Sequence, residues 1–299
     1  LVGLNLQKNK ETLTMCGIVG AISNQNIVPH LIEGLSRLEY RGYDSVGVAV
    51  VDRNGQLARE RVTGRVKMLA EKCSKDKFKG LVGIGHTRWA THGGVTESNA
   101  HPHFSNETLA VVHNGIIENY APLKEELLKR GYVFHSDTDS EVLVNLIEEI
   151  QKKENLKLGK AVQVALNQVV GAYAIAVFDK KNPNEIVAAR LGSPLAIGVG
   201  EGEYFIASDA SPFIEYTSNA IYLEDGEMAN IRLHKPMKVR KIKDDSIVDP
   251  YIQELQMNLE QIEKGGYDHF MLKEIYEQPN VIKDTYRGRL HANEGLIQM

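Results

Sequence analysis

The sequence predicts an α+β fold in which β-sheets pack together and are covered by helices. Short apolar runs of strand length recur along the chain, with glycines and turn residues between them. Amphipathic segments with a helical period lie between groups of these runs. Strands mixed with pairs of helices are typical of packed sheets under helical layers.

The first half of the chain is expected to combine strands and helices. A strand follows Cys16, and residues 27–38 form an amphipathic helix because their large apolar side chains recur every three or four residues. Further strands are expected at residues 46–51, 81–86 and 109–112. Helices follow at residues 120–130, where Gly131 supplies the stop, and at residues 140–151.

The second half is rich in short strands, expected at residues 172–178, 186–189, 195–199, 204–207 and 220–231. Asp249 and Pro250 then open an expected helix with one apolar stripe, formed by Ile252, Leu255, Leu259 and Ile262. We therefore expect three parts: a leader or mis-set start at residues 1–15, a globular domain at residues 16–245 and a connector at residues 246–299.

Composition and charge exclude several classes of protein. The 299 residues are 42% hydrophobic and 25% charged, as in globular proteins. The formal net charge of -4 supplies no basic field for nucleic acid or for an acidic membrane surface. Two cysteines form at most one disulfide, which is too few to hold a chain of this length together. No apolar stretch approaches the roughly 18 residues of a membrane-spanning helix. The sequence thus predicts a cytoplasmic protein without nucleic-acid or membrane partners.

The tripeptide Met15-Cys16-Gly17 is the first candidate for chemistry. Removal of an initiator Met15 would leave Cys16 with a thiol and a free α-amine, whose unperturbed pKa values are about 8.5 and about 7.7–8.0. Such an amine can take the thiol proton and so activate the sulfur as a nucleophile. The alternative is that Cys16 is a small buried hydrophobe at the start of a strand. Cys73 lies in a charged stretch and is expected to be incidental.

A polar loop follows the expected strand at residues 81–86. Arg88 could hold a carboxylate through two parallel hydrogen bonds, and Thr91 and His92 could add shorter polar contacts. The alternative is that Arg88 forms a structural ion pair at the end of the strand.

Two further motifs have both a structural and a chemical interpretation. Asn114-Gly115 is typical of a type I′ hairpin turn, but the Asn114 amide and the Gly115 N–H could instead donate to one oxyanion. Asp137 and Asp139 lie where a helix begins, so at least one of them is expected to cap it, and the other could bind a ligand ammonium.

Histidines gather between residues 86 and 113 and suggest a metal site as an alternative. Their spacing matches no zinc-binding pattern, so the sequence predicts neither a metal nor a cofactor. The five are His86, His92, His101, His103 and His113.

Taken in order, these motifs resemble class II glutamine amidotransferase domains. The resemblance extends from Met15 to about Ile242 and is carried by MCGIVG, LEYRGYDS, GHTRWATHG, NAHPH, VHNGIIENY and TDSE. Within that class, the amino-acid sequences of these motifs are most similar to the glutaminase half of glutamine–fructose-6-phosphate aminotransferases. The segment FMLKEIYEQP, at residues 270–279, resembles the lead-in to the sugar-phosphate isomerase half of those enzymes.

The resemblance implies an N-terminal-nucleophile (Ntn) hydrolase fold, a four-layer αββα sandwich. It also implies catalytic roles: Cys16 would attack the side-chain amide of L-glutamine with its own α-amine as base, while Asn114 and the Gly115 N–H would hold the oxyanion. Residues 1–14 and Met15 would have to be absent from the working enzyme, because an amide nitrogen on Cys16 is no base.

The same resemblance implies a set of glutamine-binding residues. Arg88 would bind the α-carboxylate and Asp139 the α-amino group, and the remaining members of this set are Trp89, Thr91 and His92. Arg41 and His86 would support the surroundings of the nucleophile.

In whole enzymes of this kind, the ammonia would convert fructose 6-phosphate to glucosamine 6-phosphate, and the isomerase half would form a homodimer. Three alternatives stay open: the glutaminase half of amidophosphoribosyltransferases, an inactive regulatory domain of the same fold, and a metal hydrolase. The intact set of residues argues against an inactive domain, and chelation would test for a metal hydrolase.

Overall fold

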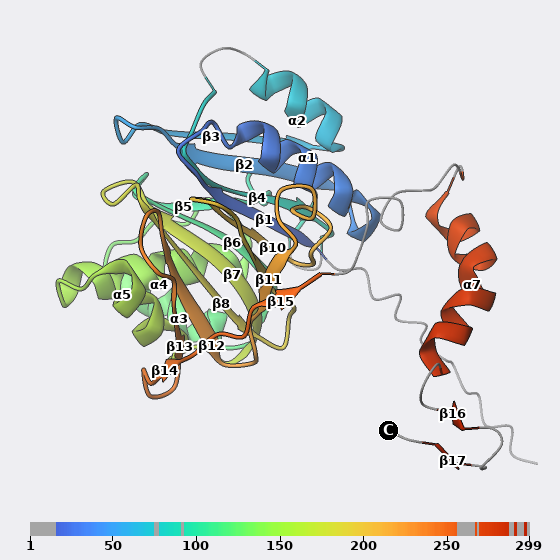
Figure 1. Cartoon of the computed structure of the whole chain (residues 1–299). Helices are drawn as coiled ribbons and strands as arrows, with labels where there is room; N and C mark the ends of the chain where they lie inside the picture. Colours follow the sequence, from blue (N-terminus) through green and yellow to red (C-terminus); the bar gives the residue numbers. More distant parts are fainter. Residues whose placement is uncertain are drawn as a thin grey trace, which may run out of the picture. The chain divides into compact units, whose positions relative to one another are not determined.

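Figure 1 shows a computed structural model of the chain. The structure describes residues 16–74, 78–90, 93–255, 267, 269–286, 290–291 and 296–297. The chain divides into two units, Leu1–Leu255 and Gln256–Met299. The predicted leader at residues 1–15 lies outside the described residues.

The first unit contains an eight-stranded antiparallel sheet in the order β15-β11-β9-β10-β1-β4-β2-β3. Its strands are β1 (Gly17–Ile22), β2 (Ser45–Val51), β3 (Leu57–Thr63), β4 (Val82–Arg88), β9 (Ala196–Val199), β10 (Tyr204–Ala207), β11 (Asn219–Tyr222) and β15 (Gln253–Glu254).

A second antiparallel sheet has seven strands in the order β14-β13-β12-β8-β7-β6-β5. These strands are β5 (His103–Ser105), β6 (Leu109–Ile117), β7 (Gly171–Asp179), β8 (Glu185–Leu191), β12 (Glu227–Arg232), β13 (Lys238–Lys241) and β14 (Ile247–Val248).

Helices cover the outer face of each sheet, which gives four layers in the order helix, sheet, sheet, helix (Figure 1). The first sheet carries α1 (Val28–Leu38) and α2 (Val66–Cys73), and a short 3-10 helix, η1 (Glu39–Arg41), follows α1. The second sheet carries α3 (Tyr120–Lys129), α4 (Asp139–Lys153) and α5 (Leu158–Leu166).

The alternation of side chains along the strands explains this layering. In β1, Val19 and Ala21 pack in the core under α1 and α2, whereas Ile18 and Ile22 point the other way, into the core between the two sheets. Phe178 of β7 is fully buried in that same central core. A third core lies between the second sheet and helices α3, α4 and α5. Burying one large apolar side chain stabilises a fold by about 1.5–3 kcal/mol, so the three cores together hold the sheets in place.

The second unit contains one helix and one strand pair among its described residues. Helix α7 spans Phe270–Tyr286 and includes Pro279, while β16 (Leu290–His291) pairs with β17 (Leu296–Ile297). No helix in the described part of the chain is long and apolar enough to cross a membrane.

Most predicted helices and strands are confirmed, and two of them differ from the structure. The expected helix from Asp249 is not formed up to Leu255: residues 253–254 form β15, which pairs with β11, and the Leu255 N–H donates to Ser218 O at 2.7 Å. The rest of that prediction, residues 256–262, lies outside the described residues. The single strand expected at residues 220–231 is divided into β11 and β12, with Gly226 at φ +78 in the turn between them.

Candidate active site

Cys16 lies directly before β1, beside the end of β4. Gly17 pairs with Thr87 in the sheet, and this register brings Cys16 next to the residues that follow Thr87. The Trp89 N–H donates to Cys16 Sγ at 3.2 Å, and Sγ lies 3.5 Å from Trp89 O. Cys16 is partly exposed, whereas Cys73 is buried, so only Cys16 is open to a substrate.

The surroundings of Cys16 keep its sulfur protonated. Burial raises the pKa of the Cys16 thiol, and the carboxylate of Asp44 acts in the same direction. The hydrogen bond with Trp89 and the charge of Arg88 oppose this shift but do not cancel it. The pKa of Cys73 is raised further, to about 12, mainly by burial. Neither thiol is therefore a preformed thiolate at neutral pH.

Asn114 connects β6 to the start of β1. Its Nδ2 donates to Cys16 O at 2.9 Å and to Ser208 Oγ at 3.1 Å. The hairpin turn considered for Asn114-Gly115 is wrong, because β6 continues through both residues to Ile117 and pairs with β7 throughout. The amide is thus held on a rigid strand rather than on a loop.

His86 fixes which way the Asn114 amide faces. His86 Nε2 lies 2.8 Å from Asn114 Oδ1, and complete burial lowers the pKa of this imidazole to about 3. A neutral ring that contacts a carbonyl oxygen must donate from Nε2, so the amide nitrogen is directed toward Cys16.

Gly115 has a backbone that only glycine adopts easily. Its φ is +132, and a Cβ placed there would lie 2.0 Å from Ala172 O. Any side chain at this position would push β6 away from β7 and move Asn114 with it.

Arg88, the last residue of β4, reaches across the following loop. Its guanidinium donates to Gly94 O at 3.1 Å and to Gly93 O at 3.3 Å. Asn99 also donates to Gly94 O, at 3.0 Å. Trp89 is 42% exposed at the edge of this loop. The predicted residues Thr91 and His92 lie outside the described residues.

Asp139 is the first residue of α4 and is buried. Its Oδ2 accepts from the Ile117 N–H at 2.8 Å, which ties α4 to the end of β6. The expected capping role is wrong for both aspartates: Thr138 occupies the cap position, and Asp137 Oδ2 instead accepts from Asn99. Asp139 is therefore hydrogen-bonded to Ile117 of β6, two residues after Gly115.

Arg41 supports the same region through a carboxylate. Its Nη2 and Nε lie 2.7 and 3.0 Å from Asp209 Oδ2, and the Tyr40 hydroxyl donates to the same oxygen at 2.7 Å. The preceding residue, Ser208, accepts from Asn114 and from the Ile18 N–H at 2.9 Å. Ser208 and Asp209 were not predicted; the signal available in the sequence is a polar pair directly after an apolar strand.

Four of the five histidines form a buried group behind this site. The rings of His86 and His101 lie 4.2 Å apart, and those of His101 and His103 lie 4.5 Å apart. Burial lowers the pKa of all three, and of His113. Among the residues that the structure describes, no group of three or more His, Cys, Asp or Glu side chains is placed to hold a metal ion.

Sequence comparison identifies the family of proteins that this chain resembles. Residues 86–215 match the family model of the glutamine amidotransferase domain, and the chain therefore carries a glutamine amidotransferase domain. The chain is 54% identical over 279 residues to glutamine–fructose-6-phosphate aminotransferase (isomerizing) of Bacteroides thetaiotaomicron, covering 93% of this chain and 45% of that protein. The enzyme of the same name from Chlorobaculum tepidum is 49% identical over 290 residues, covering 95% and 47%. The chain thus spans about half the length of these relatives.

Solved structures identify the fold. Glutamine phosphoribosylpyrophosphate amidotransferase from B. subtilis matches with a TM-score of 0.65 and 28% identity, over 78% of this chain and 50% of that one. A glutamine aminotransferase class-II domain protein from Silicibacter pomeroyi matches with a TM-score of 0.52 at 15% identity, over 76% of this chain and 99% of that one, which supports the fold alone. The predicted Ntn-hydrolase αββα sandwich is confirmed. The resemblance to the fructose-6-phosphate aminotransferases is confirmed as well, since these relatives are far more similar in sequence than the phosphoribosylpyrophosphate enzyme.

Proposed function

We propose that this domain hydrolyses L-glutamine to glutamate and ammonia with Cys16 as the nucleophile. The observation that carries the proposal is the contact of the Asn114 amide with the main chain of Cys16, at 2.9 Å. It holds a hydrogen-bond donor beside a partly exposed thiol, as stabilisation of a tetrahedral oxyanion requires.

The chemistry follows from these positions. Cys16 Sγ attacks the side-chain carbonyl carbon of glutamine, and the α-amine of Cys16 takes the thiol proton. The negative oxygen that forms is held by the Asn114 amide, which turns one N–H from its present acceptor, and by the Gly115 N–H. The C–N bond then breaks, the protonated amine gives its proton to the departing ammonia, and a thioester remains. Water attacks the thioester and releases glutamate and the free thiol.

The α-amino-acid end of glutamine is bound by residues at the end of β4, in the loop that follows it and at the start of α4. Arg88 holds the α-carboxylate through its guanidinium, and Asp139 holds the α-ammonium. Trp89, Thr91 and His92 complete the loop that covers the substrate. Arg41 and His86 act as positioning residues, since they contact Asp209 and Asn114 rather than the substrate.

The larger reaction is proposed from the names of the relatives. In a protein of their full length, the ammonia would pass to fructose 6-phosphate and give glucosamine 6-phosphate. We assign residues 16–245 to the glutaminase domain and residues 246–299 to the connector toward the sugar-phosphate part. A homodimer formed through that part and a cytoplasmic location stay predictions.

The test combines the intact mass of the purified protein with its glutamine-to-glutamate turnover. Cys16→Ala should abolish turnover with little change in melting temperature, whereas the matched control Cys73→Ala should keep turnover. We expect active protein to begin at Cys16. Turnover by protein that retains residues 1–15 would refute the α-amine mechanism, and turnover by Cys16→Ala would refute the nucleophile. Loss of turnover on chelation would support the metal-hydrolase alternative instead.

A further inference from the structure

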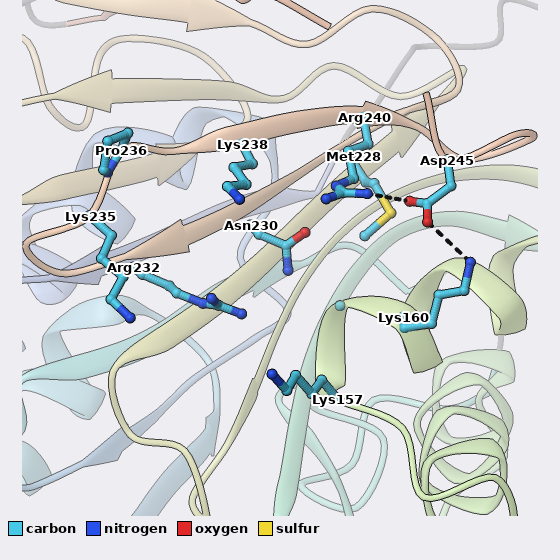
Figure 2. A pocket seen from close by; sticks show the side chains of 11 residues that line it. Lys157, Lys160, Met228, Asn230, Arg232, Lys235, Pro236, Lys238, Arg240 and Asp245 are labelled. Carbon is cyan, nitrogen blue, oxygen red and sulfur yellow. Dashed lines mark hydrogen bonds and ion pairs between the residues drawn. The ribbon is translucent and has the colours of Figure 1, made fainter. Parts of the chain in front are cut away.

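A cavity of about 450 Å³ is lined by residues outside the candidate active site. It is formed by the start of α5, by β12, and by β13 with the turn that precedes it (Figure 2). None of the residues that line it belongs to the proposed glutamine site. Basic side chains dominate its walls: Lys157, Lys160, Arg232, Lys235, Lys238 and Arg240.

Half of these cations already have carboxylate partners. Lys160 and Arg240 both contact Asp245, each at 3.1 Å, as Figure 2 shows. Partial burial raises the pKa of Asp245, but its hydrogen bonds with these two cations outweigh that effect and keep the pKa below its usual value. Arg232 contacts the buried Glu185 at 2.8 Å.

The other three cations are not compensated. The ammonium groups of Lys157, Lys235 and Lys238 have no ion-pair or hydrogen-bond partner among the described residues. They come from two segments far apart in the sequence, and the fold brings them to one cavity (Figure 2). Gathering like charges costs electrostatic energy, and a bound anion would offset that cost.

The start of α5 adds donors to the same cavity. The amides of Leu158 and Gly159 have no acceptor within the helix, and the helix has no side-chain cap at Lys157. Gly159 lets this helix end approach β12 closely, since a Cβ there would lie 2.1 Å from Asn230 Nδ2. The positive end of the helix dipole thus acts together with the lysines.

We propose that this basic cavity is a binding site for a small oligophosphate, an anion with two or more phosphate groups. Three separate lysines and a helix N-terminus supply several donors and positive charges, and two or more phosphate groups offer them more oxygens and more negative charge than one phosphate group does. The cavity volume falls in the range typical of small-molecule sites, about 300–1,000 Å³.

Isothermal titration calorimetry of the chain with inorganic pyrophosphate tests the proposal. We expect binding that weakens as salt screens the charges, and orthophosphate should bind roughly tenfold more weakly because it contacts fewer cations. Lys157→Gln and Lys238→Gln should each weaken pyrophosphate binding by roughly threefold to tenfold. The matched control is Lys67→Gln, on α2 at the opposite helical layer, which should change binding less than about twofold.

Separate outcomes would overturn the proposal and leave the glutaminase intact. Pyrophosphate binding that survives both lysine substitutions would place it elsewhere on the surface. Binding that is lost in Cys16→Ala or displaced by glutamine would place it in the glutamine site. A poly-glutamate peptide that binds while pyrophosphate does not would identify the cavity as a contact for an acidic protein segment.

Discussion

The buried neutral ring of His86 should make the fold less stable in mild acid, where the unfolded chain binds a proton at this residue and the folded chain does not. This ring is completely buried, and its pKa falls from 6.5 to about 3 because burial penalises the charged form. In the unfolded chain His86 binds a proton as the pH falls through about 6.5, whereas in the folded chain it stays neutral until the pH approaches 3. The stability contribution of the neutral ring is therefore fully present above pH 6.5 and is lost as the pH falls toward 3.

The size of the effect follows from the two pKa values. At pH 5 the unfolded ring is charged and the folded ring is not, which lowers the free energy of unfolding by about 2 kcal/mol relative to pH 7. The buried rings of His101, His103 and His113 shift in the same direction and add to the total.

Urea unfolding at pH 7 and pH 5 measures this contribution. His86→Gln keeps an N–H donor for Asn114 Oδ1 but does not titrate, so it should lose about 2 kcal/mol less than the parent between the two pH values. The matched control is His135→Gln, because this histidine is exposed rather than buried. An equal pH dependence in His86→Gln and the parent would show that His86 is not held neutral by burial.

Three further substitutions test the site. Arg88→Lys should raise the KM for glutamine roughly tenfold with little change in kcat, because an ammonium cannot form two parallel hydrogen bonds; an unchanged KM would remove Arg88 from the carboxylate site. Asn114→Ala should lower kcat by about two to three orders of magnitude, the usual cost of losing one oxyanion donor, and steady-state kinetics showing a smaller loss would contradict that role. Gly115→Ala should lower the free energy of unfolding by about 3 kcal/mol, because its Cβ would lie 2.0 Å from Ala172 O. Gly131→Ala, at φ +88 with nothing near its Cβ, should cost only about 1 kcal/mol in the same urea titration.

Local patterns predicted the elements whose side chains pack with a simple period. Short apolar runs predicted β1 and β2, whose successive side chains enter the helix-covered core and the central core in turn. Helix α5 was not among the predicted elements, although Leu158, Ala161, Val162 and Ala165 recur at helical spacing and all are buried. The apolar stripe of α5 is therefore visible in the sequence alone.

Long-range pairing decided what local patterns left open. Asn-Gly favours a turn by itself, but nine residues of β6 pair with β7, and this ladder outweighs the local preference at Asn114 and Gly115. Ser208 contacts the Ile18 N–H across 190 residues of sequence, so nothing near either residue predicts the contact. The basic cavity is hidden in the same way, because the formal net charge of the chain is -4 and its lysines meet only in the folded protein.

The raised pKa of the Cys16 thiol and the proposed role of its nitrogen belong together. Burial keeps the sulfur protonated, so a base must remove the proton at the moment of attack. The Asp44 carboxylate is a poor candidate for this base, because it already accepts hydrogen bonds from Ala90 N–H and from Ser45 Oγ. A free α-amine on Cys16 has a pKa of about 7.7–8.0, so about half of it or more is unprotonated near pH 8 and can accept a proton. It also lies on the same residue as the thiol. While Met15 is attached, the same nitrogen is an amide and accepts no proton. Because burial keeps the thiol protonated, turnover depends on removal of Met15, which converts the Cys16 nitrogen from an amide into a free amine.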